Sequence, residues 1–151
     1  MIPWIVVWVC AMGAPAEQGV DAWNGVSMSE HVLLVSWCAY PTDWPYVTYR
    51  LETGYKEGYC LPVHGGCAAP SLRYAWCIDK PTCAHELGHL LGLSHPHDTK
   101  CQGYIRPQAA HPLLWDVVDS TVMDWSTGCA GMVGGPYPSD AKLLRAALTA
   151  P

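Results

Sequence analysis

The chain has 151 residues, half of them hydrophobic, so it can form one domain around a single core but not a second full domain. Its formal net charge is -5, and its eight Lys and Arg residues form no cluster, which argues against a nucleic-acid-binding protein. Charged residues make up only 14% of the chain, a composition that suits a compact domain and argues against disorder.

The first sixteen residues fit two interpretations. Residues 2–12 are an apolar run too short to span a membrane, and Ala14-Pro15-Ala16 resembles a signal-peptide cleavage site. However, no Lys or Arg precedes the run, and its β-branched and aromatic residues are typical of a buried first strand. Both interpretations stay open: residues 1–16 are a signal peptide or a first strand, and residues 17–151 form the domain.

Eight cysteines in so short a chain predict disulfide bonds. Disulfides persist in oxidising compartments, so we expect a secreted or extracellular protein, with the periplasm as an alternative, and no stable membrane span. The pair that we expect to be bonded is Cys101 with Cys129, because the two bracket the segment between the two motifs described below.

Hydrophobic patterning upstream of residue 80 predicts alternating helix and strand. Residues 17–26 have the apolar spacing of a helix, and residues 31–38 contain a continuous apolar run that is typical of a buried strand. Shorter strands are predicted at 47–51 and 72–78, with loops over the glycine- and cysteine-rich residues 52–71.

The strongest motif is HELGHLLGLSH over residues 85–95. On a helix, His85 and His89 lie one turn apart on the same face, so both imidazoles can reach one zinc ion with Glu86 beside it. Gly92 permits the positive φ that ends the helix, which lets the chain turn back so that His95 becomes a third ligand. Three histidines leave one coordination position open, as in catalytic zinc sites.

The motif helix has the expected cap and core face. Thr82 follows Pro81 and is predicted as the N-cap. Ala84, Leu87 and Leu91 form an apolar stripe that would pack on the core and hold the ligands on a rigid element.

The extended H-E-x-x-H-x-x-G-x-x-H pattern resembles that of the metzincin metallopeptidases. Residues 120–125, with Met123 near their centre, are similar to the family's methionine turn, and the surrounding motif is closest to the serralysin and matrixin branches. Trp125 stands where serralysins have a tyrosine. The resemblance implies that Met123 lies beneath the zinc as a hydrophobic base and not as a ligand.

The same resemblance implies a fold. It is an α+β zincin domain with a twisted, mostly parallel sheet, an active-site helix ending at Gly92, and a small C-terminal part with the methionine turn and a closing helix. Residues 138–140 followed by 141–148 resemble that closing helix, with Ser139 as its N-cap.

The function expected from these residues is a zinc-dependent endopeptidase, in which Glu86 activates the water that attacks the peptide bond. Asp98 and Asp124 are candidate supporting groups that orient ligands, although both also fit ordinary turn residues. We expect a monomer that contains Zn²⁺, has a protein or peptide substrate and binds no nucleic acid. Two alternatives are a secreted zinc-binding module that binds a partner protein without cleaving it, and a disulfide-stabilised adhesion or inhibitor domain in which the motif is coincidental.

Overall fold

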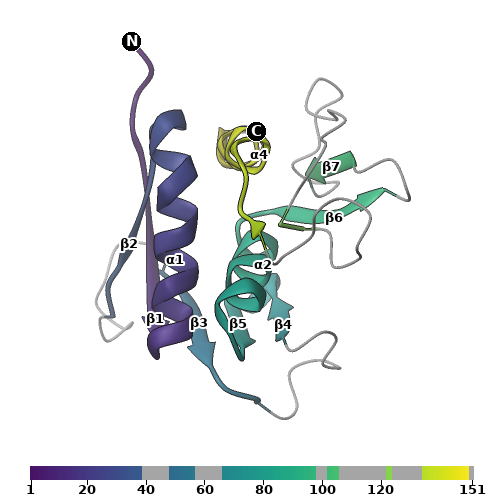
Figure 1. The fold of residues 1–151 in the computed structure, drawn as a ribbon. Helices are drawn as coiled ribbons and strands as arrows, with labels where there is room; N and C mark the ends of the chain where they lie inside the picture. Colours follow the sequence, from purple (N-terminus) through teal and green to yellow (C-terminus); the bar gives the residue numbers. More distant parts are fainter. Residues whose placement is uncertain (39–47, 57–65, 98–101, 106–121, 124–133, 150–151) are drawn as a thin grey trace.

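The fold is mixed α+β, as Figure 1 shows for a computed structural model of the chain. The structure describes residues 1–38, 48–56, 66–97, 102–105, 122–123 and 134–149. These residues form a five-stranded sheet, a two-stranded sheet, three α-helices and two short 3₁₀ helices. The 3₁₀ helices are η1 (Met28–Glu30) and η3 (Pro70–Leu72).

The large sheet is mostly parallel. Its strand order is β2-β1-β3-β5-β4, and every neighbouring pair is parallel except β4 with β5. The strands are β1 (Ile5–Met12), β2 (Val32–Ser36), β3 (Thr48–Thr53), β4 (Gly66–Ala69) and β5 (Tyr74–Cys77). The segment for which the sequence left a leader or a strand open is therefore strand β1 in this structure, between β2 and β3.

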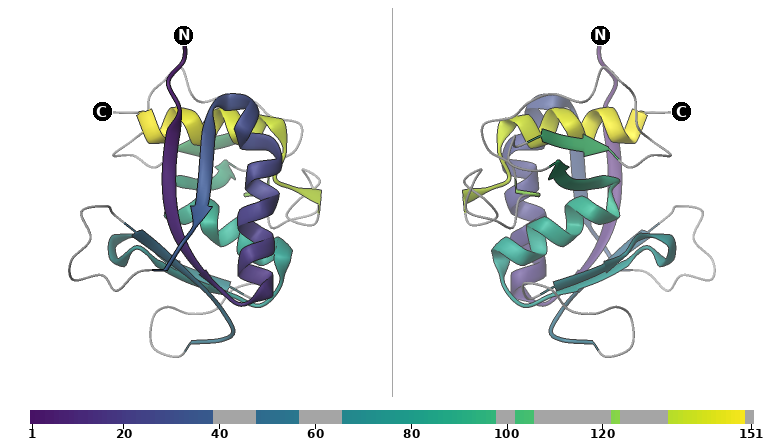
Figure 2. Two further views of the ribbon diagram at one scale, coloured as in Figure 1. Left: turned by 90° about the vertical axis from the view of Figure 1, so that its left-hand side faces the viewer. Right: turned by 90° about the vertical axis from the view of Figure 1, so that its right-hand side faces the viewer.

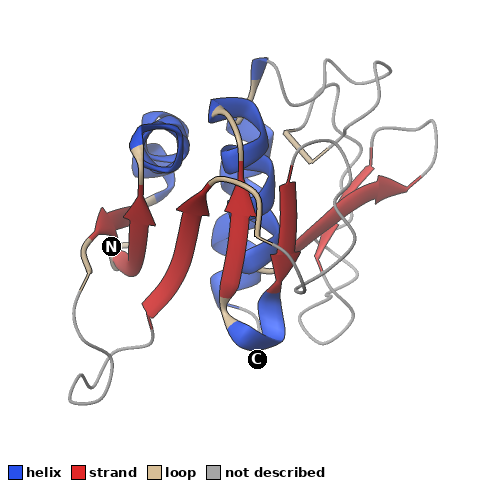
Figure 3. Cartoon of the chain, turned by 90° about the horizontal axis from the view of Figure 1, so that it is seen from below, coloured by secondary structure: helices blue, strands red, loops and turns tan. Residues whose placement is uncertain are grey.

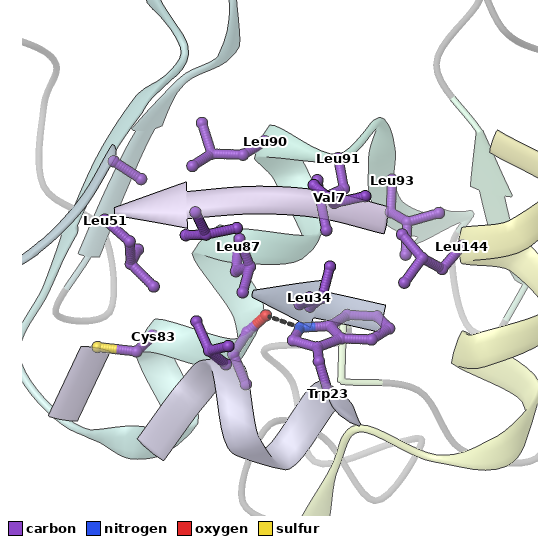
Figure 4. Close-up of a cluster of buried hydrophobic side chains, with 14 of the residues drawn as sticks. Val7, Trp23, Leu34, Leu51, Cys83, Leu87, Leu90, Leu91, Leu93 and Leu144 are labelled. Atoms are coloured by element: carbon purple, nitrogen blue, oxygen red, sulfur yellow. Dashed lines mark hydrogen bonds between the residues drawn. The ribbon is translucent and has the colours of Figure 1, made fainter. Parts of the chain in front are cut away.

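Helices α1 (Ala14–Ser27) and α2 (Lys80–Leu90) lie on the same side of this sheet (Figure 3). Between them and the sheet is the main hydrophobic core, part of which Figure 4 shows. The inward-facing residues of β1 alternate, with Val7, Val9 and Ala11 buried toward the helices. This is the period of two expected for a strand, and it places one face of β1 in the core, whereas Val6 on the other face is exposed.

The two helices approach each other closely. A Cβ added at Gly19 of α1 would lie 2.9 Å from the Cβ of Cys83, so only glycine allows this separation. One turn further along, the fully buried Trp23 donates a hydrogen bond from Nε1 to the carbonyl oxygen of Ala84, at 2.8 Å (Figure 4). α1 thereby fixes the part of α2 that leads directly into the histidine motif.

The rest of the described chain lies at one end of the molecule. β6 (Leu93–His97) pairs with β7 (Gln102–Ile105) in an antiparallel two-stranded sheet. Helix α4 (Pro138–Thr149) crosses the start of β1 (Figure 2), where Arg145 donates hydrogen bonds to the carbonyl oxygens of Pro3 and Glu30.

Several predicted boundaries differ from the observed ones. Residues 52–71 are not all loop, because β3 continues to Thr53 and Gly66–Ala69 form the antiparallel edge strand β4. Ser139 is not an N-cap, because α4 already begins at Pro138. Glycine and cysteine in this region indicated loops, yet pairing with β5 holds four of these residues in a strand.

Two disulfides lie wholly within the described residues. Cys10 of β1 is bonded to Cys38 after β2, and Cys77 at the end of β5 is bonded to Cys83 in the first turns of α2. These bonds are compatible with an oxidising compartment. No helix in the described part of the chain is long and apolar enough to cross a membrane. The predicted pair Cys101–Cys129 lies outside the described residues.

Candidate functional site

The helix that carries the motif begins earlier than predicted. Its N-cap is Asp79, whose carboxylate accepts a hydrogen bond from the backbone N–H of Thr82 at 2.9 Å. The Thr82 hydroxyl in turn lies 3.2 Å from the backbone N–H of Asp79 and accepts from it, which completes a capping box. The prediction of Thr82 as the N-cap was therefore wrong, since Pro81 lies inside the first turn, where it needs no hydrogen-bond donor.

His85 and His89 converge on one point. Their Nε2 atoms are 3.1 Å apart, and the two rings meet edge to face with centroids 4.7 Å apart. His85 is 4% exposed and lies on the buried side of α2, so its ring is held among packed residues. The i, i+4 spacing therefore brings the two imidazoles together as predicted.

Backbone carbonyls fix the tautomer of both rings. Nδ1 of His85 lies 2.9 Å from the carbonyl oxygen of Val122, and Nδ1 of His89 lies 3.0 Å from that of Leu93. A carbonyl oxygen only accepts, so each Nδ1 carries the proton and donates it. In the neutral rings both Nε2 atoms then present lone pairs to each other, and neither can donate to the other.

This arrangement fits a shared cation. Two nitrogen ligands at 2.0–2.1 Å from a tetrahedral zinc ion lie about 3.3 Å apart, close to the observed separation of 3.1 Å. Metal-bound histidines also commonly donate their other ring N–H to a backbone carbonyl. His85 and His89 therefore have the chemistry and spacing of two zinc ligands.

Glu86 is a buried carboxyl group on the same helix. It is 6% exposed, and burial raises its pKa to about 8. Its side chain packs against β4, where a Cβ added at Gly66 would lie 2.6 Å from Cγ and 2.9 Å from Oε1 of Glu86. The carboxyl group is thus placed between the histidine helix and the edge strand of the sheet.

Met123 packs against the same turn of α2. It is 1% exposed, and its sulfur occupies the space where a side chain at Gly88 would be. Trp23 reaches the same space, with Cζ2 3.3 Å from the position of that missing Cβ. Met123 therefore supports the helix between the two histidines, and only the absence of a side chain at residue 88 allows this contact.

The chain after α2 turns at Gly92, which has the predicted positive φ of 110°. α2 ends at Leu90 and β6 begins at Leu93, so the backbone of His95 lies in β6. The side chain of His95 lies outside the described residues, as do Asp98 and Asp124. Their predicted roles remain predictions.

Three contributors to this site were not predicted. Val122 supplies the carbonyl for His85, Asp140 accepts hydrogen bonds that fix Val122, and Gly66 gives space to Glu86. Val122 is 37 residues from His85, and no local pattern links the two. The sequence did indicate that Asp140, as a carboxylate in the first turn of a helix, accepts backbone N–H groups near that helix. It did not indicate that Asp140 also accepts the N–H of Val122.

The chain matches no protein-family model, no curated protein sequence and no solved structure. Among the described residues, moreover, no group of three or more His, Cys, Asp and Glu side chains is arranged to hold a metal ion. The assignment to the metzincin metallopeptidases was therefore wrong. The motif fixed a local geometry, that of two histidines on one helix, and this does not determine a family.

Proposed function

We propose that the chain is a zinc-dependent hydrolase of peptide bonds, with His85 and His89 as two of the metal ligands and Glu86 as the proton-transfer group. The main support for this proposal is the histidine pair, whose Nε2 atoms lie 3.1 Å apart. In each ring the Nδ1 proton is directed to a backbone carbonyl oxygen. The sequence predicts His95 as the third ligand. Zinc bound here would polarise a substrate carbonyl and lower the pKa of a bound water.

Glu86 has a suitable environment for proton transfer. In the proposed reaction its carboxylate takes the proton of the attacking water and later gives it to the leaving amine. Burial alone raises its pKa to about 8, and a divalent cation nearby would lower that value, since it stabilises the carboxylate. A carboxyl group whose pKa is raised in this way accepts a proton more readily than an exposed carboxylate, as both steps require.

Strand β4 supports a peptide as the substrate. Within the described residues β4 pairs only with β5, so it is an edge strand, and its first residue Gly66 contacts Glu86. An extended peptide can add to such an edge through backbone hydrogen bonds, whatever its side chains. A peptide added here would pass beside the Glu86 carboxyl group. Secretion, inferred from the cysteine content, would give this activity extracellular protein substrates.

The test compares casein hydrolysis and zinc content in the oxidised parent, Glu86→Gln and Glu17→Gln. Glu17 is an exposed carboxylate on α1, so its substitution makes the same chemical change away from the site. We expect about one zinc per chain in all three proteins. Glu86→Gln should lose hydrolysis by roughly 100-fold or more, the usual contribution of a general acid–base group, and Glu17→Gln should not.

Each other result has a defined meaning. If the parent binds zinc but cleaves nothing, the chain is a zinc-binding module, and its role is to bind a partner protein. If it binds no zinc, the metal proposal is wrong. A His89→Ala variant that keeps the parent's zinc would also contradict the ligand assignment.

A further inference from the structure

Asp140 is connected to His85 through a single residue. Oδ2 of Asp140 accepts hydrogen bonds from the backbone N–H of Val122 at 2.8 Å and of Tyr137 at 2.9 Å. The carbonyl oxygen of the same Val122 accepts the Nδ1 proton of His85 at 2.9 Å. The N-terminal turn of α4 thus holds the backbone group that orients a candidate ligand on α2.

Every member of this connection is buried. Asp140 and Val122 are fully buried, and His85 is 4% exposed. Hydrogen bonds to a carboxylate are stronger than bonds between neutral groups, and they gain further strength away from water. The position of Val122 is restricted on a second side by Gly135, where an added Cβ would lie 2.7 Å from the Val122 Cβ. The Val122 carbonyl therefore has little freedom to turn away from His85.

We propose that Asp140 is a positioning residue, which holds the Val122 carbonyl so that His85 stays in the tautomer with its Nε2 lone pair directed at His89. Its importance for metal binding rests on the proposed function, whereas its control of the tautomer does not. The competing view is that Asp140 only stabilises the start of α4 through Tyr137. A cap of α4 needs no bond to Val122, because Val122 is 18 positions away and outside the helix. The bond to Val122 is therefore the feature that the positioning role explains and the capping role does not.

The first experiment measures the His85 tautomer in metal-free protein by long-range ¹H–¹⁵N NMR, at a pH where the ring is neutral. The parent should show the Nδ1–H form, and Asp140→Ala should show a substantial Nε2–H population. Leu144→Ala is the control, because Leu144 is fully buried on the same helix, so its truncation destabilises the packing of α4 without removing the hydrogen bond from Val122 to Asp140. We expect it to keep the parental tautomer.

A second variant reaches Val122 without altering Asp140. Gly135→Ala adds a Cβ against Val122 and should shift the tautomer in the same direction, which keeps the test decisive if Asp140→Ala does not fold. If both variants keep the parental tautomer, the proposal is wrong.

Zinc affinity is the second measurement, and it applies only if the proposed zinc site exists. Loss of a group that orients a ligand commonly weakens metal binding by about 10–100-fold, so Asp140→Ala should fall in this range and Leu144→Ala should not. Equal affinities in these two variants would leave Asp140 as a stabiliser of α4 only. If the parent binds no zinc, the proposed function fails, while the tautomer measurement still decides the role of Asp140.

Discussion

Two glycines give the neighbours of the histidine pair their space. At Gly88 the Met123 sulfur and the Trp23 ring fill the volume of a side chain, and at Gly66 the Glu86 side chain does so. Neither glycine has a positive φ, so its role is close approach and not backbone conformation. Single methyl groups added here therefore probe the site without changing any polar group.

Gly66→Ala tests the position of Glu86. The new Cβ would lie 2.6 Å from Cγ of Glu86, so the carboxyl group must shift, and a misplacement of roughly 1 Å can cost on the order of 100-fold in rate. We expect a large fall in casein hydrolysis with unchanged zinc content. The control is Gly25→Ala on α1, where an added Cβ has no atom within 4 Å. Equal activity in the two variants would show that the Glu86 position does not matter for catalysis.

The sequence predicted the part of the site that is local. His85, Glu86 and His89 lie within one and a half turns of helix, and the helical period alone places the two histidines together. Val122 and Asp140 reach the same site from other segments, through contacts of 37 and 18 residues in sequence separation. Such contacts depend on how the elements pack, which residue spacing does not encode.

Among the elements, helix α2 is restrained at its N-terminal end by two features. The capping box of Asp79 and Thr82 satisfies backbone N–H groups there, and the Cys77–Cys83 disulfide joins the end of β5 to the helix. The site histidines follow within two turns. Two separate substitutions can test how much each restraint contributes.

Asp79→Ala removes the carboxylate that caps α2. We expect the free energy of unfolding to fall by about 1 kcal/mol, the usual cost of losing an N-cap side chain, seen as a lower urea midpoint with an unchanged m-value. Asp21→Ala on the exposed face of α1 makes the same charge change and should have a much smaller effect. If both variants lose the same stability, the effect comes from charge and not from the cap.

The disulfides should contribute unequally. Cys77–Cys83 closes a loop of 6 residues and Cys10–Cys38 one of 28, so chain entropy predicts about 2 and about 3.6 kcal/mol respectively. Urea unfolding of the two double alanine variants measures this difference. The Cys77/Cys83 variant keeps the longer bridge and should be the more stable of the two. The reverse order would show that the short bridge acts mainly through the native packing of α2.

Hydrophobic patterning predicted the helices and strands with a clear apolar period better than those without one. The long helices and the apolar strand after α1 were found, with boundaries within a few residues. β4 was missed, because Gly66–Ala69 contains no large apolar residue and becomes a strand only through its pairing with β5. The helical motif likewise predicted two convergent histidines but not the family.

At the scale of the whole molecule, β1 is an internal strand of the large sheet. β1 pairs with β2 on one side and with β3 on the other, so it connects β2 to the rest of the sheet. It also contributes Val7 and Val9 to the core and Cys10 to a disulfide. A chain that lacks this strand would leave β2 without its only partner among the described strands.

Deletion of residues 1–16 should therefore abolish folding. We expect the 17–151 chain, expressed in an oxidising compartment, to show no cooperative thermal transition and a reactive thiol at Cys38. The control lacks only residues 1 and 2, which are exposed, and should melt close to the parent because β1 remains complete. A cooperative transition in the 17–151 chain would instead support a leader that is removed, and mass spectrometry of the exported protein would then show an N-terminus at Glu17. If β1 belongs to the folded domain, the exported protein should instead retain Ile5–Met12.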